Sequence, residues 1–383
     1  MSFVPRVLVT LLLAAALAGC ANRNAHDLFP PVAVQTPQAS VERVFVATTR
    51  APSSDPKIVF SGQRSRTESF ASVGISIPPD HKIGVIERPR GKTRDPQKYF
   101  TARSFAPIGT AGEFLNSVAA SARQEGGRAL VFVHGYNTNF DSAVYRASQI
   151  VHDAGYAGAP VLFSWASSGR VVDYVYDRDS ANAARDSLEG LLRGLAKSGV
   201  KRIDIIAHSM GTWLAMEALR GLAISGDRDL GGRLGDVVLA SPDIDVDVFR
   251  TQMKRYGKPD RPFTVLLSGD DRALRFSSLI AGQQPRLGEY KDAADIAELG
   301  VVVVDLTRIK SGDSLNHAKF ADNPALVTLL GESLRRGDEL SGERDLDDTI
   351  SLLLRGAGHT LGGAADIIIT TPGAVISAAL GGG

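Results

Sequence analysis

The sequence has very little cysteine and no strong excess of charge of either sign. Only one of its 383 residues, Cys20, is a cysteine, so the chain cannot form an intramolecular disulfide. Lysine and arginine together number 43, against 42 aspartates and glutamates, and this balance gives no basic surface for nucleic acid. There is also no Cys/His cluster with metal-ligand spacing and no phosphate-binding loop of the P-loop kind. We therefore expect no cofactor, no metal and no nucleic-acid partner.

The apolar run near the N-terminus is too short to cross a membrane. It covers residues 7–18, whereas a spanning helix needs about 20 apolar residues. The run ends in Leu17-Ala18-Gly19-Cys20, which resembles the lipobox of bacterial lipoproteins, where the cysteine begins the mature chain and carries acyl groups. An ordinary signal peptide with an incidental cysteine is the alternative.

The lipobox pattern sets an expected organisation for the N-terminal region. We expect a signal peptide over residues 1–19, lipidation of Cys20, and a polar membrane tether over residues 20–40. Ala21 is not the aspartate that retains a lipoprotein in the inner membrane. We therefore expect the outer membrane, with the protein facing the periplasm and contacting the membrane through its lipid anchor.

The most informative feature is a serine between an apolar strand pattern and a helical pattern. Ala207-His208-Ser209-Met210-Gly211 follows the apolar run 203–206 and precedes a helical pattern over residues 212–219. This is the context of the G-x-S-x-G nucleophile turn, with Ala207 in place of the first glycine. Such a turn lifts the serine hydroxyl clear of the sheet, and the helix N-terminus faces any oxyanion formed there. We predict Ser209 as a nucleophile and the Met210 N–H as an oxyanion donor.

A second strand pattern ends in the dipeptide His134-Gly135. α/β-Hydrolases place their second oxyanion N–H after an early strand of this kind. We expect that donor to be the N–H of Tyr136 or of Asn137. His134 is interpreted as a structural residue that holds this loop through hydrogen bonds.

A serine nucleophile needs a base, and histidine has a pKa suited to that task. In the α/β-hydrolase order the base follows the acid, which leaves two histidines, His317 and His359. His359 lies in a glycine-rich stretch that is poorly suited to holding a ring, so we predict His317. His208 is a neighbour of the serine that should point away from it, and we interpret it as pocket lining or packing.

The acid of the triad should follow the strand pattern at residues 263–267. Asp270 and Asp271 both lie there, and adjacent side chains point in opposite directions, so only one can face His317. We favour Asp271, deeper in the turn, and interpret Asp270 as a turn or N-cap residue. Asp243, at the end of the preceding strand pattern, is the remaining alternative and is interpreted as a structural or pocket-wall residue.

The order of patterns along the chain predicts the fold class. Residues 41–110 should form antiparallel strands, and strand and helix patterns alternate from Arg128 onward. This alternation is typical of an α/β-hydrolase fold, with a mostly parallel central sheet and helices on both faces. We assign the hydrolase domain to residues 41–335. Residues 336–383 are expected to be a linker and a loosely packed or disordered glycine-rich apolar tail.

Several stretches resemble a bacterial α/β-hydrolase family of unknown function within the lipase/esterase superfamily. The resemblance covers roughly residues 41–335, implies the fold and a serine-hydrolase mechanism, and says little about the substrate. One loop departs from the pattern, because Trp165 is followed by alanine where proline is expected. The resembling stretches are Val44–Arg50, Val73–Gly84, Phe132–Asn137, Phe163–Trp165, Ala207–Gly211, Ala240–Asp245 and Asp271–Leu274.

These observations favour a membrane-anchored serine hydrolase acting on carboxylic esters, with an ester or lipid-like small molecule as its substrate. An amidase or thioesterase with the same triad would share the acyl-enzyme mechanism. A non-catalytic envelope protein, which uses the scaffold for binding or assembly, is the alternative from another class.

Overall fold

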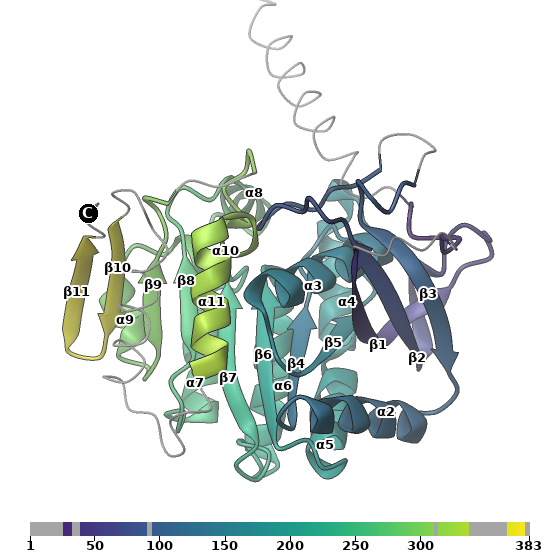
Figure 1. The fold of residues 1–383 in the computed structure, drawn as a ribbon. Helices are drawn as coiled ribbons and strands as arrows, with labels where there is room; N and C mark the ends of the chain where they lie inside the picture. Colours follow the sequence, from purple (N-terminus) through teal and green to yellow (C-terminus); the bar gives the residue numbers. More distant parts are fainter. Residues whose placement is uncertain (1–25, 33–38, 90–93, 310–312, 337–365, 380–383) are drawn as a thin grey trace, which may run out of the picture.

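The computed structural model describes residues 26–32, 39–89, 94–309, 313–336 and 366–379. These residues build one sheet of eleven strands, flanked by helices on both faces (Figure 1). Its strand order is β11-β10-β9-β8-β7-β6-β4-β5-β1-β2-β3. The strands are β1 (Ser40–Pro52), β2 (Phe60–Ile77), β3 (Thr101–Ile108), β4 (Arg128–Val133), β5 (Ala159–Ser164), β6 (Arg202–His208), β7 (Leu234–Ala240), β8 (Thr264–Leu267), β9 (Val302–Asp305), β10 (Asp366–Thr371) and β11 (Ala374–Ala379).

Parallel pairing dominates the centre of the sheet, and antiparallel pairing is confined to its two edges. β4 to β9 are mutually parallel, and β1 joins them through a parallel contact with β5. β1, β2 and β3 form an antiparallel meander, as the sequence predicted for residues 41–110. The expected fold class, a mostly parallel sheet of the α/β-hydrolase type covered on both faces, is confirmed.

Alternating side chains of the central strands divide the core into two layers. On β4, Val131 and Val133 pack with α2, α5, α6 and α7, whereas Leu130 and Phe132 pack with α3 and α10 on the other face. The helices of the described residues are α2 (Ala111–Gln124), α3 (Phe140–Ala154), η1 (Val171–Asp173), α4 (Tyr174–Ala183), α5 (Arg185–Lys197), α6 (Met210–Ile224), α7 (Val246–Tyr256), α8 (Arg272–Ile280), η2 (Leu287–Glu289), α9 (Ala293–Ala297), α10 (Lys319–Asp322) and α11 (Pro324–Arg336).

The expectation of a loosely packed C-terminal tail is corrected over residues 366–379. β10 pairs with β9 and with β11, so a hairpin extends the sheet at this edge (Figure 1). Ile367 and Ile369 are buried and pack on Val302, Val304 and the start of α11. A run of β-branched residues over 367–371 favours this strand, and the glycines around it made the pattern hard to recognise in the sequence. The rest of the predicted linker and tail, including His359, lies outside the described residues.

Part of the predicted tether is built into the domain. The Leu28 side chain is buried in the core layer that contains α3, and its N–H donates to Asp141 Oδ2 at 3.0 Å. Asp27 forms an ion pair with Arg88 at 2.7 Å. The signal peptide and Cys20 lie outside the described residues. None of the helices that the structure describes is long and apolar enough to span a membrane.

Candidate active site

Ser209 lies at the tight turn between β6 and α6 and has a backbone conformation that is costly for a residue with a side chain. Its φ is 54° and its ψ is −125°. A conformation of this kind costs about 1–3 kcal/mol and persists only where its surroundings enforce it. Here the Ser209 N–H donates to Ala240 O at 2.9 Å, and its carbonyl accepts from the N–H groups of Thr212 and Asp243. These hydrogen bonds therefore hold Ser209 in its strained conformation at the carboxyl edge of the parallel strands.

Two glycines make room for this turn. A Cβ on Gly211 would lie 2.4 Å from His134 O, and a Cβ on Gly135 would lie 2.9 Å from Ser209 Cβ. Both distances are below 3.0 Å, and real Cβ atoms essentially never lie that close to another heavy atom. The β6–α6 turn and the loop after β4 can therefore meet only if both positions lack a side chain.

Gly135→Ala is expected to lower kcat by about 10²-fold, because the added methyl group displaces Ser209 from its position in the turn. Gly190→Ala on α5 is the matched control, since a Cβ there meets nothing within 4 Å. Steady-state kinetics and thermal unfolding of both variants provide the check. Equal kcat values in the two variants would contradict the close approach.

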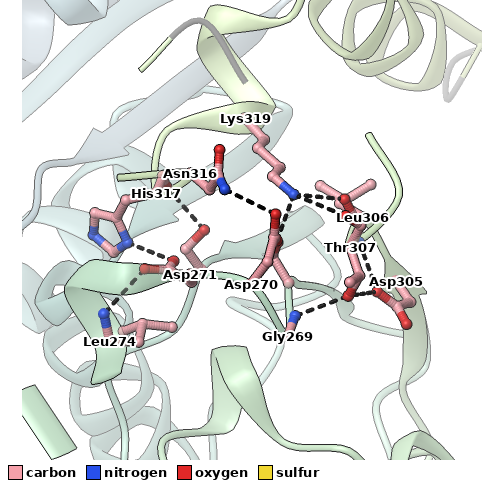
Figure 2. A network of polar contacts seen from close by, with 12 residues as sticks. Gly269, Asp270, Asp271, Leu274, Asp305, Leu306, Thr307, Asn316, His317 and Lys319 are labelled. Carbon is pink, nitrogen blue, oxygen red and sulfur yellow. Dashed lines mark hydrogen bonds and ion pairs between the residues drawn. The ribbon is translucent and has the colours of Figure 1, made fainter. Parts of the chain in front are cut away.

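His317 and Asp271 form the second part of the site. His317 Nδ1 lies 2.7 Å from Asp271 Oδ2, and the Asp271 carboxylate is fully buried (Figure 2). Asp271 Oδ1 accepts from the N–H groups of Ala273 and Leu274 at 2.9 and 3.0 Å, so this carboxylate also caps α8. With Nδ1 engaged, His317 has its Nε2 left for a nucleophile.

The main chain of His317 is fixed independently of its ring. His317 O accepts hydrogen bonds from Ser241 Oγ at 3.0 Å and from His208 Nε2 at 3.2 Å. His317 N donates to Asp313 Oδ1 at 3.1 Å. Because His208 adjoins Ser209 in the chain, its bond ties the β6–α6 turn to the His317 loop. Among the described residues no hydrogen bond joins the Ser209 hydroxyl to the His317 ring. Such a bond is often long or poorly aligned before substrate binds.

Asp270 points away from His317, as Figure 2 shows. Its carboxylate binds the Lys319 ammonium at 2.6 Å and the Asn316 side-chain amide at 2.8 Å. Burial acts to raise the pKa of Asp270, but the hydrogen bonds from Lys319 and Ser268 outweigh it and lower that pKa. Asp270 therefore holds the loop that carries His317, while Asp271 holds the ring itself.

Asp243 connects two segments beside the site. Its Oδ2 accepts from Tyr174 Oη at 3.0 Å, its Oδ1 accepts from Ser277 Oγ at 2.9 Å, and Arg286 Nε lies 3.3 Å from Oδ1. Burial raises the pKa of this carboxyl group. Both oxygens are thus used within the protein, in keeping with a structural role.

Buried charged side chains bind the loop after β4, which carries the predicted oxyanion donors Tyr136 and Asn137. Arg50 donates to Thr138 O at 2.7 Å and to Ser167 O at 2.7 Å. Asp177 accepts from the N–H of Asn137 at 3.0 Å. This bond already uses the Asn137 N–H, so the oxyanion site proposed below relies on Tyr136 from this loop. Met210 is the first residue of α6, where the N–H groups point out of the helix.

Two further histidines, His134 and His208, lie next to the candidate site. His134 stacks on Trp165 with ring centroids 5.0 Å apart, and its Nδ1 lies 2.8 Å from Gly135 O. Burial and the charge of Arg50 lower the pKa of His134 to about 3, so its ring is neutral. Burial and the nearby His317 likewise lower the pKa of His208. The expectation that His134 holds its loop fits these contacts.

The electrostatics of His317 predict how activity depends on pH. Burial by itself lowers its pKa, but the charge of Asp271 and the hydrogen bond that His317 donates to it outweigh burial, so the pKa is raised above the ordinary 6.5. A general base must be neutral, so kcat/KM is expected to fall as the pH drops through this raised value. In Asp271→Asn the acid limb should move to lower pH. A pH–rate profile with its midpoint at or below 6.5 in the wild type would contradict this assignment.

Sequence reasoning did not identify the groups that position the His317 loop. Ser241, directly after β7, and His208, at the end of β6, bind the His317 carbonyl, and Lys319 binds Asp270. The topology of the sheet could have indicated Ser241. The carboxyl ends of parallel strands lie at one edge of the sheet, and Ser241 directly follows β7 at that edge. Trp165 and Tyr174 are buried near this edge.

The fold and the site together define an α/β-hydrolase. The chain belongs to the family described as alpha/beta hydrolase of unknown function (DUF900), whose model matches residues 112–333. A comparison with curated proteins finds no match. Among solved structures the chain is similar to lipase B of Aspergillus fumigatus, with a TM-score of 0.37 and 15% identity over 66% of this chain and 68% of that one.

Proposed function

We propose that this protein is a serine hydrolase that cleaves carboxylic esters through an acyl-enzyme on Ser209. Ser209 attacks the ester carbonyl while His317 Nε2 accepts its proton and then returns it to the leaving alcohol. Water attacks the acyl-enzyme in the second half of the reaction, with His317 again acting as base. Asp271 orients the ring and stabilises the imidazolium that forms in each half.

The tetrahedral intermediate carries an oxyanion that needs two donors. We assign them to the N–H groups of Met210 and Tyr136, and the N-terminal end of the α6 dipole adds to their effect. The observation that carries the proposal is the 2.7 Å contact between the His317 ring and a buried carboxylate, on a loop tied to the strained Ser209 turn. We further propose that lipidated Cys20 anchors the enzyme in the bacterial envelope, at the outer membrane facing the periplasm.

A substrate panel tests the reaction class. The full-length protein in detergent micelles is offered short- and long-chain p-nitrophenyl esters, with matched anilides and thioesters. Turnover of esters well above that of anilides supports the proposal. Preferential turnover of anilides or thioesters would assign an amidase or a thioesterase to the same triad. Inactivity towards all three, in a protein with a cooperative thermal unfolding transition, would favour the binding function.

A further inference from the structure

Exposed apolar side chains gather on two short segments at the active-site edge of the sheet. Val172 and Val175 lie on η1 and α4, with Val172 71% exposed. Phe276, Leu279 and Ile280 lie on α8, with Leu279 66% exposed. These five residues, the rim patch, make up half of the large apolar side chains that are exposed in the described part of the chain. Apolar groupings of this kind mark interaction surfaces.

The two halves of the rim patch are joined to the catalytic groups. The η1 segment is bound to the oxyanion loop, because Tyr136 Oη donates to Val171 O. Helix α8 begins directly after Asp271, which caps it. Asp243 bridges the two halves, since it binds Tyr174 of α4 and Ser277 of α8. Both halves of the rim patch are therefore bonded to residues of the candidate site.

Helix α8 has the pattern of a helix that lies in a membrane interface. Leu274 and Ser277 face the protein, while Phe276 and Leu279 are exposed beside the exposed basic residues Arg272 and Arg275. Aromatic and aliphatic residues flanked by arginine suit a surface of acyl chains below anionic headgroups. This charge pattern favours a lipid surface over a second protein.

The N-terminal segment joins the domain at the same edge. Leu28 is bound to Asp141 in the first turn of α3, which follows the carboxyl end of β4, next to β6 and Ser209. His26 lies six positions after Cys20 in the chain, and six residue steps reach at most about 22 Å. A bilayer that holds acyl chains on Cys20 must therefore pass close to the active-site edge.

We propose that the rim patch rests on the bilayer that holds the Cys20 anchor, so that the site opens towards the membrane and its substrates are acyl esters of membrane lipids. This orientation rests on the lipidation proposed above. It assigns the substrate class by position, because acyl esters of the bilayer are the esters nearest to a site whose rim rests on that bilayer.

The scarcity of cysteine makes a direct test possible, because a lipidated Cys20 has no free thiol. Full-length Leu279→Cys and Val172→Cys are each labelled with a fluorophore and reconstituted into phosphatidylethanolamine–phosphatidylglycerol vesicles containing nitroxide-labelled lipid. Ile224→Cys is the matched control, since Ile224 is 49% exposed but lies at the far end of α6. We expect quenching at residues 172 and 279 at least threefold stronger than at residue 224.

Two outcomes would overturn the proposal in different ways. Vesicle flotation of the full-length protein, beside Cys20→Ala, reports the anchor alone. A wild type that does not float refutes the anchor and this orientation together. Flotation with equal or no quenching at the three positions refutes the orientation alone, and it is the result expected if a protein partner or a second copy covers the rim patch. Neither outcome bears on Ser209, which is tested separately by its own chemistry.

Discussion

Ser209→Ala is expected to reduce ester hydrolysis by about 10⁴- to 10⁶-fold while leaving the fold intact. The acyl-enzyme requires the hydroxyl, and residual turnover would come from substrate binding and the oxyanion donors alone. Alanine adds no bulk, so the contacts that fix the turn through the backbone of Ser209 persist. Single-turnover kinetics with a p-nitrophenyl ester provide the measurement, and a thermal unfolding curve serves as control. Activity within tenfold of the wild type would show that the reaction does not pass through Ser209.

Asp271→Asn is expected to lower kcat by about 10⁴-fold. The asparagine carbonyl can still accept from Ala273 and Leu274, so the cap of α8 survives. Its amide, however, would donate towards His317 Nδ1 and favour the tautomer with the proton on Nε2, which cannot accept a proton from Ser209. The variant therefore tests the proposed catalytic role of Asp271 separately from its role as the cap of α8.

Asp270→Asn provides the matched control at the neighbouring position. It weakens the contact with Lys319 but leaves the His317 ring bonded to Asp271, so kcat should change by less than about tenfold. A loss as large as that of Asp271→Asn would mean that the position of the loop, rather than the charge on Asp271, limits the reaction.

Local sequence patterns were enough to predict much of the fold and the central residues of the candidate site. Strand, turn and helix around Ser209 are encoded in one continuous segment, residues 202–224, and the alternation from Arg128 onward leads to a parallel sheet. Opposite side-chain directions indicate that only one of Asp270 and Asp271 faces His317, and the place of Asp271 deeper in the turn favours Asp271; the structure pairs Asp271 with His317.

Long-range contacts could not be predicted in the same way. Asp141, which binds the Leu28 backbone, is 113 residues from it in sequence, and no local pattern predicts that bond. The β10–β11 hairpin depends on an open edge at β9, which becomes visible only once the sheet is assembled. His208 and Ser241 both bind the carbonyl of His317. Every residue has a main-chain carbonyl, so the sequence does not show which one a side chain will bind.

Fluorophosphonate labelling of the full-length protein in detergent micelles tests the central claim most directly. The reagent reacts only with a serine whose base and oxyanion donors are assembled, and mass spectrometry of the digest locates the adduct. We predict one adduct on Ser209 in the wild type and none in Ser209→Ala. An unlabelled wild type that unfolds cooperatively on heating, or an adduct at another serine, would contradict the assignment of Ser209, His317 and Asp271 as a working triad.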